Sequence, residues 1–188
     1  MGSAFLFGFA NSLRISAVGA AISRGTNMDW MVLIGVFCVM VGLLFKVGAA
    51  PFHAWTPDVY TGAPTPVTGF MAAAVKVAAF GAMARFYTAV AAYLQWDLLY
   101  IFAGVAVLTI LVGTFAGLVQ DNVKRMLAYS SIAHAGFILM GILALQKGGT
   151  GHVLFYTLGY GLATVGAFGV VALVRGRDAE GNVLGEAP

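Results

Sequence analysis

Long apolar runs separated by short polar stretches dominate the pattern of this chain. About 20 apolar residues in helical conformation cross the hydrocarbon core of a bilayer, so each run is a candidate transmembrane helix. The runs cover residues 4–22, 30 to a break near Pro51, 66–92, 98–119, 122–145 and 153–174. The pattern therefore predicts an all-α, polytopic membrane protein with about six transmembrane helices, of which one is discontinuous near Pro51.

Composition supports the same fold class. Hydrophobic residues make up 61% of the 188 residues and charged residues only 9%, whereas soluble domains carry about a quarter charged residues. The net charge of +3 is spread along the chain and forms no basic stripe, so a nucleic-acid partner is not expected. The single cysteine, Cys38, excludes an internal disulfide and cannot build a thiolate metal site or an iron–sulfur site alone.

Domain organisation and topology follow from the polar residues. We expect one transmembrane domain over residues 1–174 and a polar, solvated tail over 175–188, and the N-terminal sequence suggests no signal peptide. Six crossings divide the loop cations between two sides. One side has Arg24 and Lys147, and the other has Lys124, Arg125, Arg175 and Arg177. By the positive-inside rule, both chain ends are predicted to be cytoplasmic.

The second apolar run contains an interruption. Lys46 is followed by a Val-Gly-Ala-Ala-Pro stretch that ends at Pro51, and His53 lies two positions after this proline. Proline removes a backbone donor and clashes with the preceding turn, so a broken helix is expected between Gly48 and Trp55. Broken helices at membrane depth are typical of transporters. The alternative is a plain proline kink or a helix end. The next helix is expected to begin with Thr65 as its cap.

Three ionisable side chains fall at mid-depth in the predicted helices. At 1.5 Å per residue, Lys46 lies roughly 24 Å, Lys76 about 15 Å and His134 about 18 Å into its helix. A charge at the bilayer centre costs at least ~2.5 kcal/mol, so each such residue is a functional candidate. We expect the three to face protein at similar depth and to form a proton relay, with Ser130 and Ser131 beside His134. The alternative is structural pairing.

The other polar residues receive simpler interpretations. His53 is either a relay member or a partner for carbonyl groups freed by Pro51. Arg85 is expected to extend toward the interface, and Lys124 and Arg125 to anchor the topology or contact lipid headgroups. The small residues of 153–174 are expected to allow close helix packing. No carboxylate lies inside the six predicted segments; Asp29, Asp58, Asp97 and Asp121 lie at their ends or in loops.

Two long motifs and one short one carry a family resemblance. The first joins Phe45-Lys46 to the stretch from Pro51 to Val67 (PFHAWTPDVYTGAPTPV), and the second is NVKRMLAYSSIAHAG at 122–136. The third is GAFGVVAL in the last predicted helix. Together they resemble the subunit N family of bacterial proton-pumping NADH:quinone oxidoreductase, respiratory complex I, over nearly all of 30–174. These subunits belong to a wider antiporter-like family that includes subunits of multisubunit sodium/proton antiporters.

The resemblance implies roles for specific residues. Lys46 matches the lysine of the broken helix, Lys76 the lysine of the next helix, and His134 the histidine that bridges two half-channels. His53 matches a histidine just after the break. By the same resemblance the chain is a central piece of two inverted five-helix repeats, and the glutamate partner of the first lysine and the second broken helix lie outside it. Asn11 and Arg14 have no counterpart in the family pattern.

The implied function is proton translocation in the inner (plasma) membrane of a cell. The expected partners are the other membrane-arm subunits of complex I, the lipid bilayer and protons. No cofactor is expected on this chain, because redox chemistry would take place in partner subunits. Two alternatives remain open: a sodium/proton antiporter subunit on the same scaffold, and a structural membrane subunit that conducts nothing.

Overall fold

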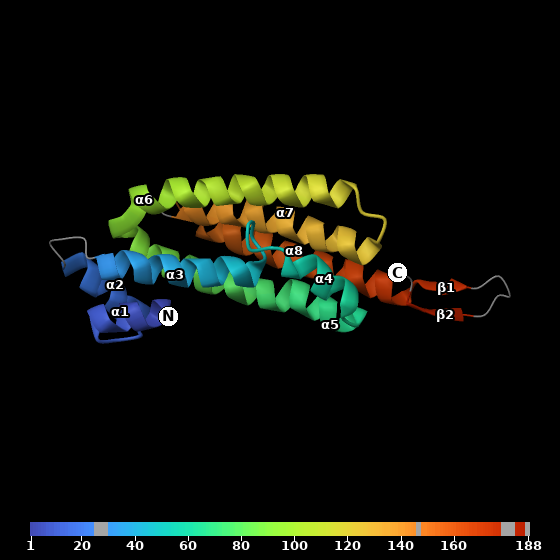
Figure 1. The fold of residues 1–188 in the computed structure, drawn as a ribbon, viewed down its shortest axis with the longest axis horizontal. Helices are drawn as coiled ribbons and strands as arrows, with labels where there is room; N and C mark the ends of the chain where they lie inside the picture. Colours follow the sequence, from blue (N-terminus) through green and yellow to red (C-terminus); the bar gives the residue numbers. More distant parts are fainter. Residues whose placement is uncertain (25–29, 146–147, 178–182, 187–188) are drawn as a thin grey trace.

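Helices lie side by side along one long axis and form a bundle (Figure 1). The structure is a computed structural model that describes residues 1–24, 30–145, 148–177 and 183–186, with the backbone alone for 91–98 and for the strands. The helices are α1 (Gly2–Ala10), α2 (Ile15–Arg24), α3 (Trp30–Val47), α4 (Trp55–Gly62), α5 (Thr65–Phe70), a π-helix (Met71–Val75), α6 (Lys76–Leu118), α7 (Val123–Leu143) and α8 (Thr150–Leu173).

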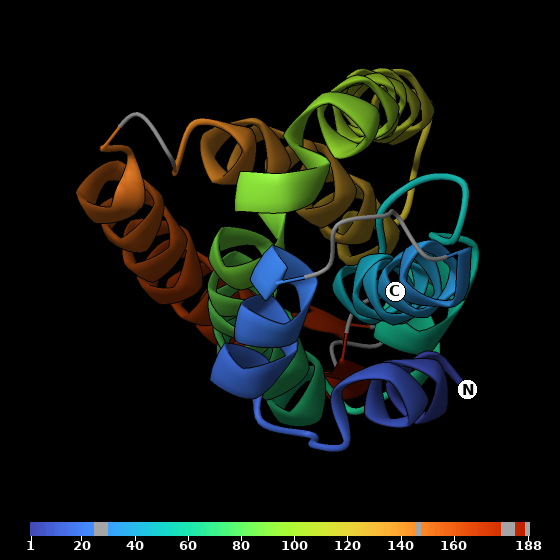
Figure 2. The same ribbon diagram turned by 90° about the vertical axis from the view of Figure 1, so that its left-hand side faces the viewer.

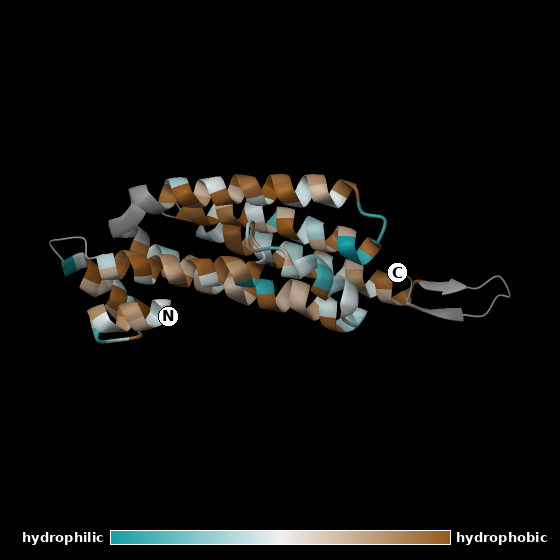
Figure 3. Cartoon of the chain, viewed as in Figure 1, coloured by the Kyte–Doolittle hydropathy of each residue, from teal (hydrophilic) through white to brown (hydrophobic). Residues whose placement is uncertain are grey.

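Five helical segments are long and apolar enough to cross a membrane, and a sixth span exists if the bent pair α1 and α2 counts as one. The five are Trp30–Val47, Thr65–Val90, Leu99–Leu118, Val123–Leu143 and Thr150–Leu173. Figure 3 shows hydrophobic residues along most of their length, with hydrophilic residues gathered in the loop between α6 and α7. The expectation of a polytopic, all-helical membrane protein is confirmed.

The backbone of α6 is helical throughout, yet α6 contains the second part of the span Thr65–Val90 and the whole span Leu99–Leu118. Figures 1 and 2 show that the chain reverses its direction near the middle of α6, so the two halves run antiparallel. The reversal lies in 91–98, between the two spans. The sequence therefore separated the two spans correctly, and the connection between them is helical rather than an open loop.

The first predicted helix, over residues 4–22, is divided into α1 and α2. α1 ends at Ala10 and α2 begins at Ile15, and their axes are bent by 58°. Asn11 ends α1 in the left-handed conformation, with φ of 50°, which asparagine tolerates better than most residues. Asn11 and Arg14 thus lie at a break in the helix, between α1 and α2.

The start of α5 differs from expectation. Thr65 is the first residue of α5 rather than its cap; the cap position is Pro64. In the predicted polar tail, β1 (Arg175–Arg177) pairs antiparallel with β2 (Val183–Glu186). Asn122 does cap α7, because its side chain accepts a hydrogen bond from the amide of Arg125 at 3.1 Å.

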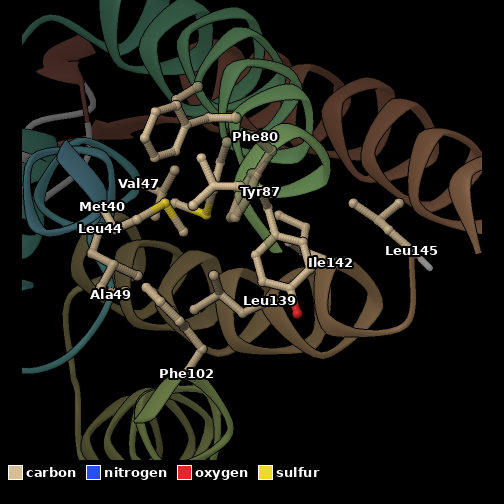
Figure 4. Close-up of a cluster of buried hydrophobic side chains, with 14 of the residues drawn as sticks. Met40, Leu44, Val47, Ala49, Phe80, Tyr87, Phe102, Leu139, Ile142 and Leu145 are labelled. Atoms are coloured by element: carbon tan, nitrogen blue, oxygen red, sulfur yellow. The ribbon is translucent and has the colours of Figure 1, made fainter. Parts of the chain in front are cut away.

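The largest buried cluster joins α3, both halves of α6 and α7. Figure 4 shows Met40 of α3, Phe80 and Tyr87 of α6 and Leu139 of α7 converging, and each is 1% exposed. In lipid there is little hydrophobic drive between helices, so dense van der Waals packing has to hold such a cluster together. The cluster fixes α6 against α7, the two helices that carry the site described below.

Small residues determine how closely α6 and α7 approach. A Cβ atom at Gly136 of α7 would lie 2.6 Å from Cγ1 of Ile110 and 2.9 Å from the carbonyl oxygen of Ala106. The expectation of close packing through small residues holds for Gly161 of α8, whose Cβ would lie 3.3 Å from Val77, but a Cβ at Gly159 would meet nothing within 4 Å. The tightest contacts therefore lie in α6 and α7 and not in the glycine-rich α8.

Candidate functional site

A break separates α3 from α4. α3 ends at Val47, and α4 begins at Trp55. Gly48 has φ of +74°, a conformation that glycine adopts without strain, and Pro51 follows within the same turn. The interruption predicted between Gly48 and Trp55 is confirmed.

Two backbone groups freed at this break find side-chain partners, one in α6 and one at the start of α4. The amide of Ala50 donates to Thr109 Oγ1 in the second half of α6 at 3.1 Å. The indole N–H of Trp55 donates to the carbonyl of Phe45 at 2.9 Å. Ala49 and Ala50 are buried, so these bonds replace the helix bonds in a place that water does not reach freely.

Two side-chain atoms beside the break have no hydrogen-bond partner among the described residues. They are Nδ1 of His53 and Oγ1 of Thr56, and both are buried. The interpretation that His53 satisfies freed carbonyls therefore finds no support at Nδ1. The hydroxyl of Thr56 faces Gly48, where a Cβ atom would lie 2.5 Å from it.

Lys76 is the buried lysine of the site. Its side chain is 2% exposed, and it begins α6 directly after the π-helix Met71–Val75. The ammonium donates to the carbonyl oxygen of Ser131 in α7 at 2.9 Å and also to the Ser131 hydroxyl. Among the described residues no carboxylate forms an ion pair with Lys76. The lysine therefore lies inside the protein with neutral partners.

Lys46 departs from expectation. Its side chain is exposed on the surface of this chain, so the prediction that it faces protein is wrong for the described residues. Lys46 and Lys76 nevertheless line the same cavity of about 260 Å³, together with Phe45, Trp55, Tyr60, Met71 and Val75. The break brings the two lysines to one cavity although they belong to different helices.

His134 lies on the other side of Ser131, in α7. Its Nδ1 forms a hydrogen bond of 2.7 Å with the hydroxyl of Tyr156 in α8. The imidazole is half-buried and borders a cavity of about 440 Å³ between α7 and α8, which Ser130, Ser131, Tyr156 and Tyr160 also line. Lys76 thus lines one cavity, and its hydrogen-bond partner Ser131 lines the other.

Two further tyrosines interact with the side chain of Ser131. Tyr60 comes from α4, just after the break, and Tyr160 comes from α8. Tyr60 also packs edge-on against Phe168 of α8, with ring centroids 6.0 Å apart. Tyr60 lines the cavity of Lys76, and Tyr160 lines the cavity of Ser131, so α4 and α8 both border the Lys76–Ser131 pair.

Sequence reasoning missed the tyrosines of this site. Tyr156 and Tyr160 are four residues apart in α8, so they lie on one helix face, and this spacing was the available signal. It was hidden because aromatic residues are common in membrane helices, and nothing in the sequence places α8 beside His134.

The two cations that open α7 also differ from their interpretation. Lys124 is buried, 8% exposed, and is not a surface anchor. Arg125 forms an ion pair with Asp58 of α4 at 3.7 Å, and the side chains of Arg125 and Asp58 are 43% and 75% exposed. The start of α7 therefore contacts α4 through this ion pair.

Comparison with known proteins places this arrangement in a family. The family model described as NADH:quinone oxidoreductase/Mrp antiporter, TM matches residues 1–183. The chain belongs to this family. The broken helix between α3 and α4 and the buried lysine that follows it are therefore features of a member of the NADH:quinone oxidoreductase/Mrp antiporter family.

Two curated members illustrate the similarity in sequence. NADH-quinone oxidoreductase subunit N of Beutenbergia cavernae is 56% identical over 186 residues, which are 99% of this chain and 35% of that protein. Subunit N of Rhodococcus opacus is 50% identical over 183 residues, which are 97% of this chain and 34% of that protein. The chain spans about a third of the length of these curated family members.

Solved structures of the family agree in fold. A chain of respiratory complex I from Thermus thermophilus, solved with bound aureothin, is 40% identical and superposes with a TM-score of 0.71 over 90% of this chain and 35% of that chain. A chain of the Mrp complex from Dietzia superposes with a TM-score of 0.77 over 92% of this chain and 31% of that chain, at 22% identity. The second similarity shows the fold alone.

Proposed function

We propose that this chain forms the central part of a proton-translocating membrane-arm subunit of NADH:quinone oxidoreductase. In this proposal Lys76 and His134 exchange protons through Ser131 and the adjoining cavities, with Lys46 and His53 on the side of the break. Residues 1–174 act as one transmembrane unit, and 175–188 are a polar tail. The redox reaction takes place in other subunits. The energy that this reaction releases reaches this chain through electrostatic coupling.

The observation that carries the proposal is the environment of Lys76. A buried ammonium without an ionic partner is costly, and insertion scales assign at least about 2.5 kcal/mol to such a charge in a membrane. The partners of Lys76, a hydroxyl and a carbonyl, reduce this cost without fixing the charge as a carboxylate would. Such a group can release and regain a proton when a neighbouring charge changes.

The order of the cavities supports a path rather than an isolated site. The cavity of about 260 Å³ contains both lysines, and the cavity of about 440 Å³ contains His134 and Ser131. Ser131 lines the second cavity, and its hydroxyl binds Lys76, which lines the first. A hydroxyl both donates and accepts, so it can connect the two cavities.

The proposed location is the plasma membrane of a bacterial cell, with both ends of the chain in the cytoplasm. Figure 1 shows the start of α7, with Lys124 and Arg125, at the same end of the bundle as β1, which contains Arg175 and Arg177. Arg24 ends α2 at the opposite end. This distribution of cations favours the proposed orientation by the positive-inside rule. The proposed partners are the other membrane-arm subunits.

The proposal is tested with Lys76→Met in the assembled complex. Methionine keeps the length and the apolar stem but carries no proton. We expect assembly to stay normal and proton pumping per NADH oxidised in membrane vesicles to fall to a small fraction of the wild-type value. Arg85→Met is the matched control, because Arg85 is an exposed cation of the same helix. Normal pumping in Lys76→Met would overturn the relay role.

Sodium dependence separates this proposal from its alternative. The family includes the Mrp antiporter, so the same scaffold can belong to a sodium/proton antiporter subunit. Proton pumping that continues in sodium-free vesicles supports the assignment to NADH:quinone oxidoreductase. Proton movement that requires sodium supports the antiporter assignment, and loss of assembly without a separate pumping defect supports a structural role.

A further inference from the structure

His134 lies among aromatic rings supplied by two helices. The centroid of its imidazole is 5.0 Å from that of Tyr160, 6.0 Å from that of Tyr156 and 6.1 Å from that of Phe137. Phe137 belongs to α7, one turn after His134, whereas both tyrosines belong to α8. The ring is therefore held by packing on more than one side, yet stacking alone does not determine which nitrogen carries the proton.

One hydrogen bond distinguishes the two ring nitrogens. Nδ1 of His134 lies 2.7 Å from the hydroxyl oxygen of Tyr156. Among the described residues no hydrogen bond joins Nε2 to another group. In a neutral imidazole one nitrogen donates and the other accepts, and the partner of one nitrogen decides which state the other takes.

We propose that Tyr156 is a positioning residue that holds His134 with Nδ1–H donating to the Tyr156 hydroxyl oxygen, so that Nε2 is the nitrogen that exchanges the proton. This inference rests on the proposed function, because it assumes that His134 is a relay member. A nitrogen that exchanges protons needs a free lone pair in the neutral ring, and Nδ1 already has a fixed partner. The proton of the neutral ring therefore belongs on Nδ1.

The same hydrogen bond survives when the ring is charged. In the imidazolium both nitrogens are donors, so Nδ1–H continues to donate to the Tyr156 oxygen after Nε2 takes up a proton. The ring therefore does not rotate between the two states. Phenylalanine at position 156 would keep the aromatic contact but leave Nδ1 without a partner, and both the tautomer and the ring orientation would then be free to change.

The experiment compares pumping per NADH oxidised in vesicles that contain the assembled complex. Tyr156→Phe removes only the hydroxyl, and 3-fluorotyrosine incorporated at position 156 restores it. Tyr100→Phe is the matched control, because Tyr100 is an exposed tyrosine of α6. We expect roughly a 3- to 10-fold loss for Tyr156→Phe, as for removal of one hydrogen bond. The fluorotyrosine variant and the control should stay within about twofold of wild type.

The outcomes separate this inference from the proposed function. If His134→Gln pumps normally, the relay role of His134 fails, and the role of Tyr156 fails with it. If His134→Gln loses pumping while Tyr156→Phe keeps it, only the positioning role is overturned. Equal losses in Tyr156→Phe and the fluorotyrosine variant would assign Tyr156 to ring packing. If the complex with Tyr156→Phe fails to assemble, the hydroxyl has a structural role. Equal losses in the two variants and failure to assemble would each overturn the inference.

Discussion

Lys76 and Ser131 are 55 positions apart in the chain, yet the ammonium of Lys76 donates to both the carbonyl and the hydroxyl of Ser131. The pair joins the start of α6 to the middle of α7, where both residues are buried. Lysine buried at mid-depth needs polar partners, and here a single serine supplies two. The position of the proposed relay therefore depends on how α6 and α7 pack.

That packing predicts the effect of Gly136→Ala. The added methyl group would overlap the side chain of Ile110 and the carbonyl of Ala106. Overpacking of this kind costs typically about 1–3 kcal/mol, so the free energy of unfolding in mixed detergent micelles should fall by that amount. Gly104→Ala is the control, because a Cβ at Gly104 meets nothing within 4 Å; it should be neutral or slightly stabilising. Equal effects in both variants would contradict the packing argument.

The second prediction concerns the hydrogen bond that Thr109 accepts at the break between α3 and α4. Thr109→Val keeps the side-chain shape but removes the acceptor of the Ala50 amide. A buried donor left without a partner costs about 1–3 kcal/mol, so unfolding should become easier by that amount and the Ala50 amide should exchange its hydrogen faster. Thr114→Val is the control, because Thr114 is exposed on the same helix. Unchanged exchange at Ala50 in Thr109→Val would contradict this role.

The break itself could be predicted from sequence because proline and glycine act locally. Pro51 and Gly48 interrupt a helix whatever surrounds them, and the structure places the interruption where these residues lie. The partners of the break could not be predicted. Thr109 lies far along the chain from Ala50, and only the packing of α6 against α3 brings its hydroxyl to the freed amide.

The candidate site was predictable in part for the same reason. The depth of an ionisable residue in an apolar run is a local property, and it identified Lys76 as buried. It failed for Lys46, whose exposed side chain depends on which other helices cover α3. It also failed for Lys124, which lies at a helix end and is nevertheless buried. Burial at a helix end depends on neighbouring segments that a hydrophobic pattern does not describe.

The ion pair of Asp58 and Arg125 should contribute little to stability. Its charged atoms are 3.7 Å apart, and the two side chains are 75% and 43% exposed. Exposed pairs contribute about 0–1 kcal/mol, because solvent screens the charges and ordering the side chains costs entropy. A double-mutant cycle with Asp58→Asn and Arg125→Gln should give a coupling energy within this range. A coupling of several kcal/mol would show that this pair fixes α4 to α7.

Ser131→Ala tests the hydroxyl on which the proposed path depends. The substitution removes one of the two acceptors of Lys76 and leaves the carbonyl in place. We expect the free energy of unfolding to fall by about 1–3 kcal/mol, because a buried donor loses a partner. Proton pumping by the assembled complex should fall as well, since alanine cannot connect Lys76 with the cavity that contains His134. Ser16→Ala is the matched control, because Ser16 is an exposed serine of α2 that lines neither cavity.

The same substitution in the Lys76→Met background distinguishes a local hydrogen bond from a general loss of packing. Methionine donates no hydrogen bond, so in that background the hydroxyl of Ser131 no longer accepts a hydrogen bond from residue 76. If the Lys76–Ser131 bond is the cause, Ser131→Ala should cost much less in the Lys76→Met chain than in the wild-type chain, and the difference measures the coupling of the two side chains. If the cost is equal in both backgrounds, Ser131 acts through its other neighbours, Tyr60 and Tyr160, and the bond to Lys76 does not determine the position of the lysine.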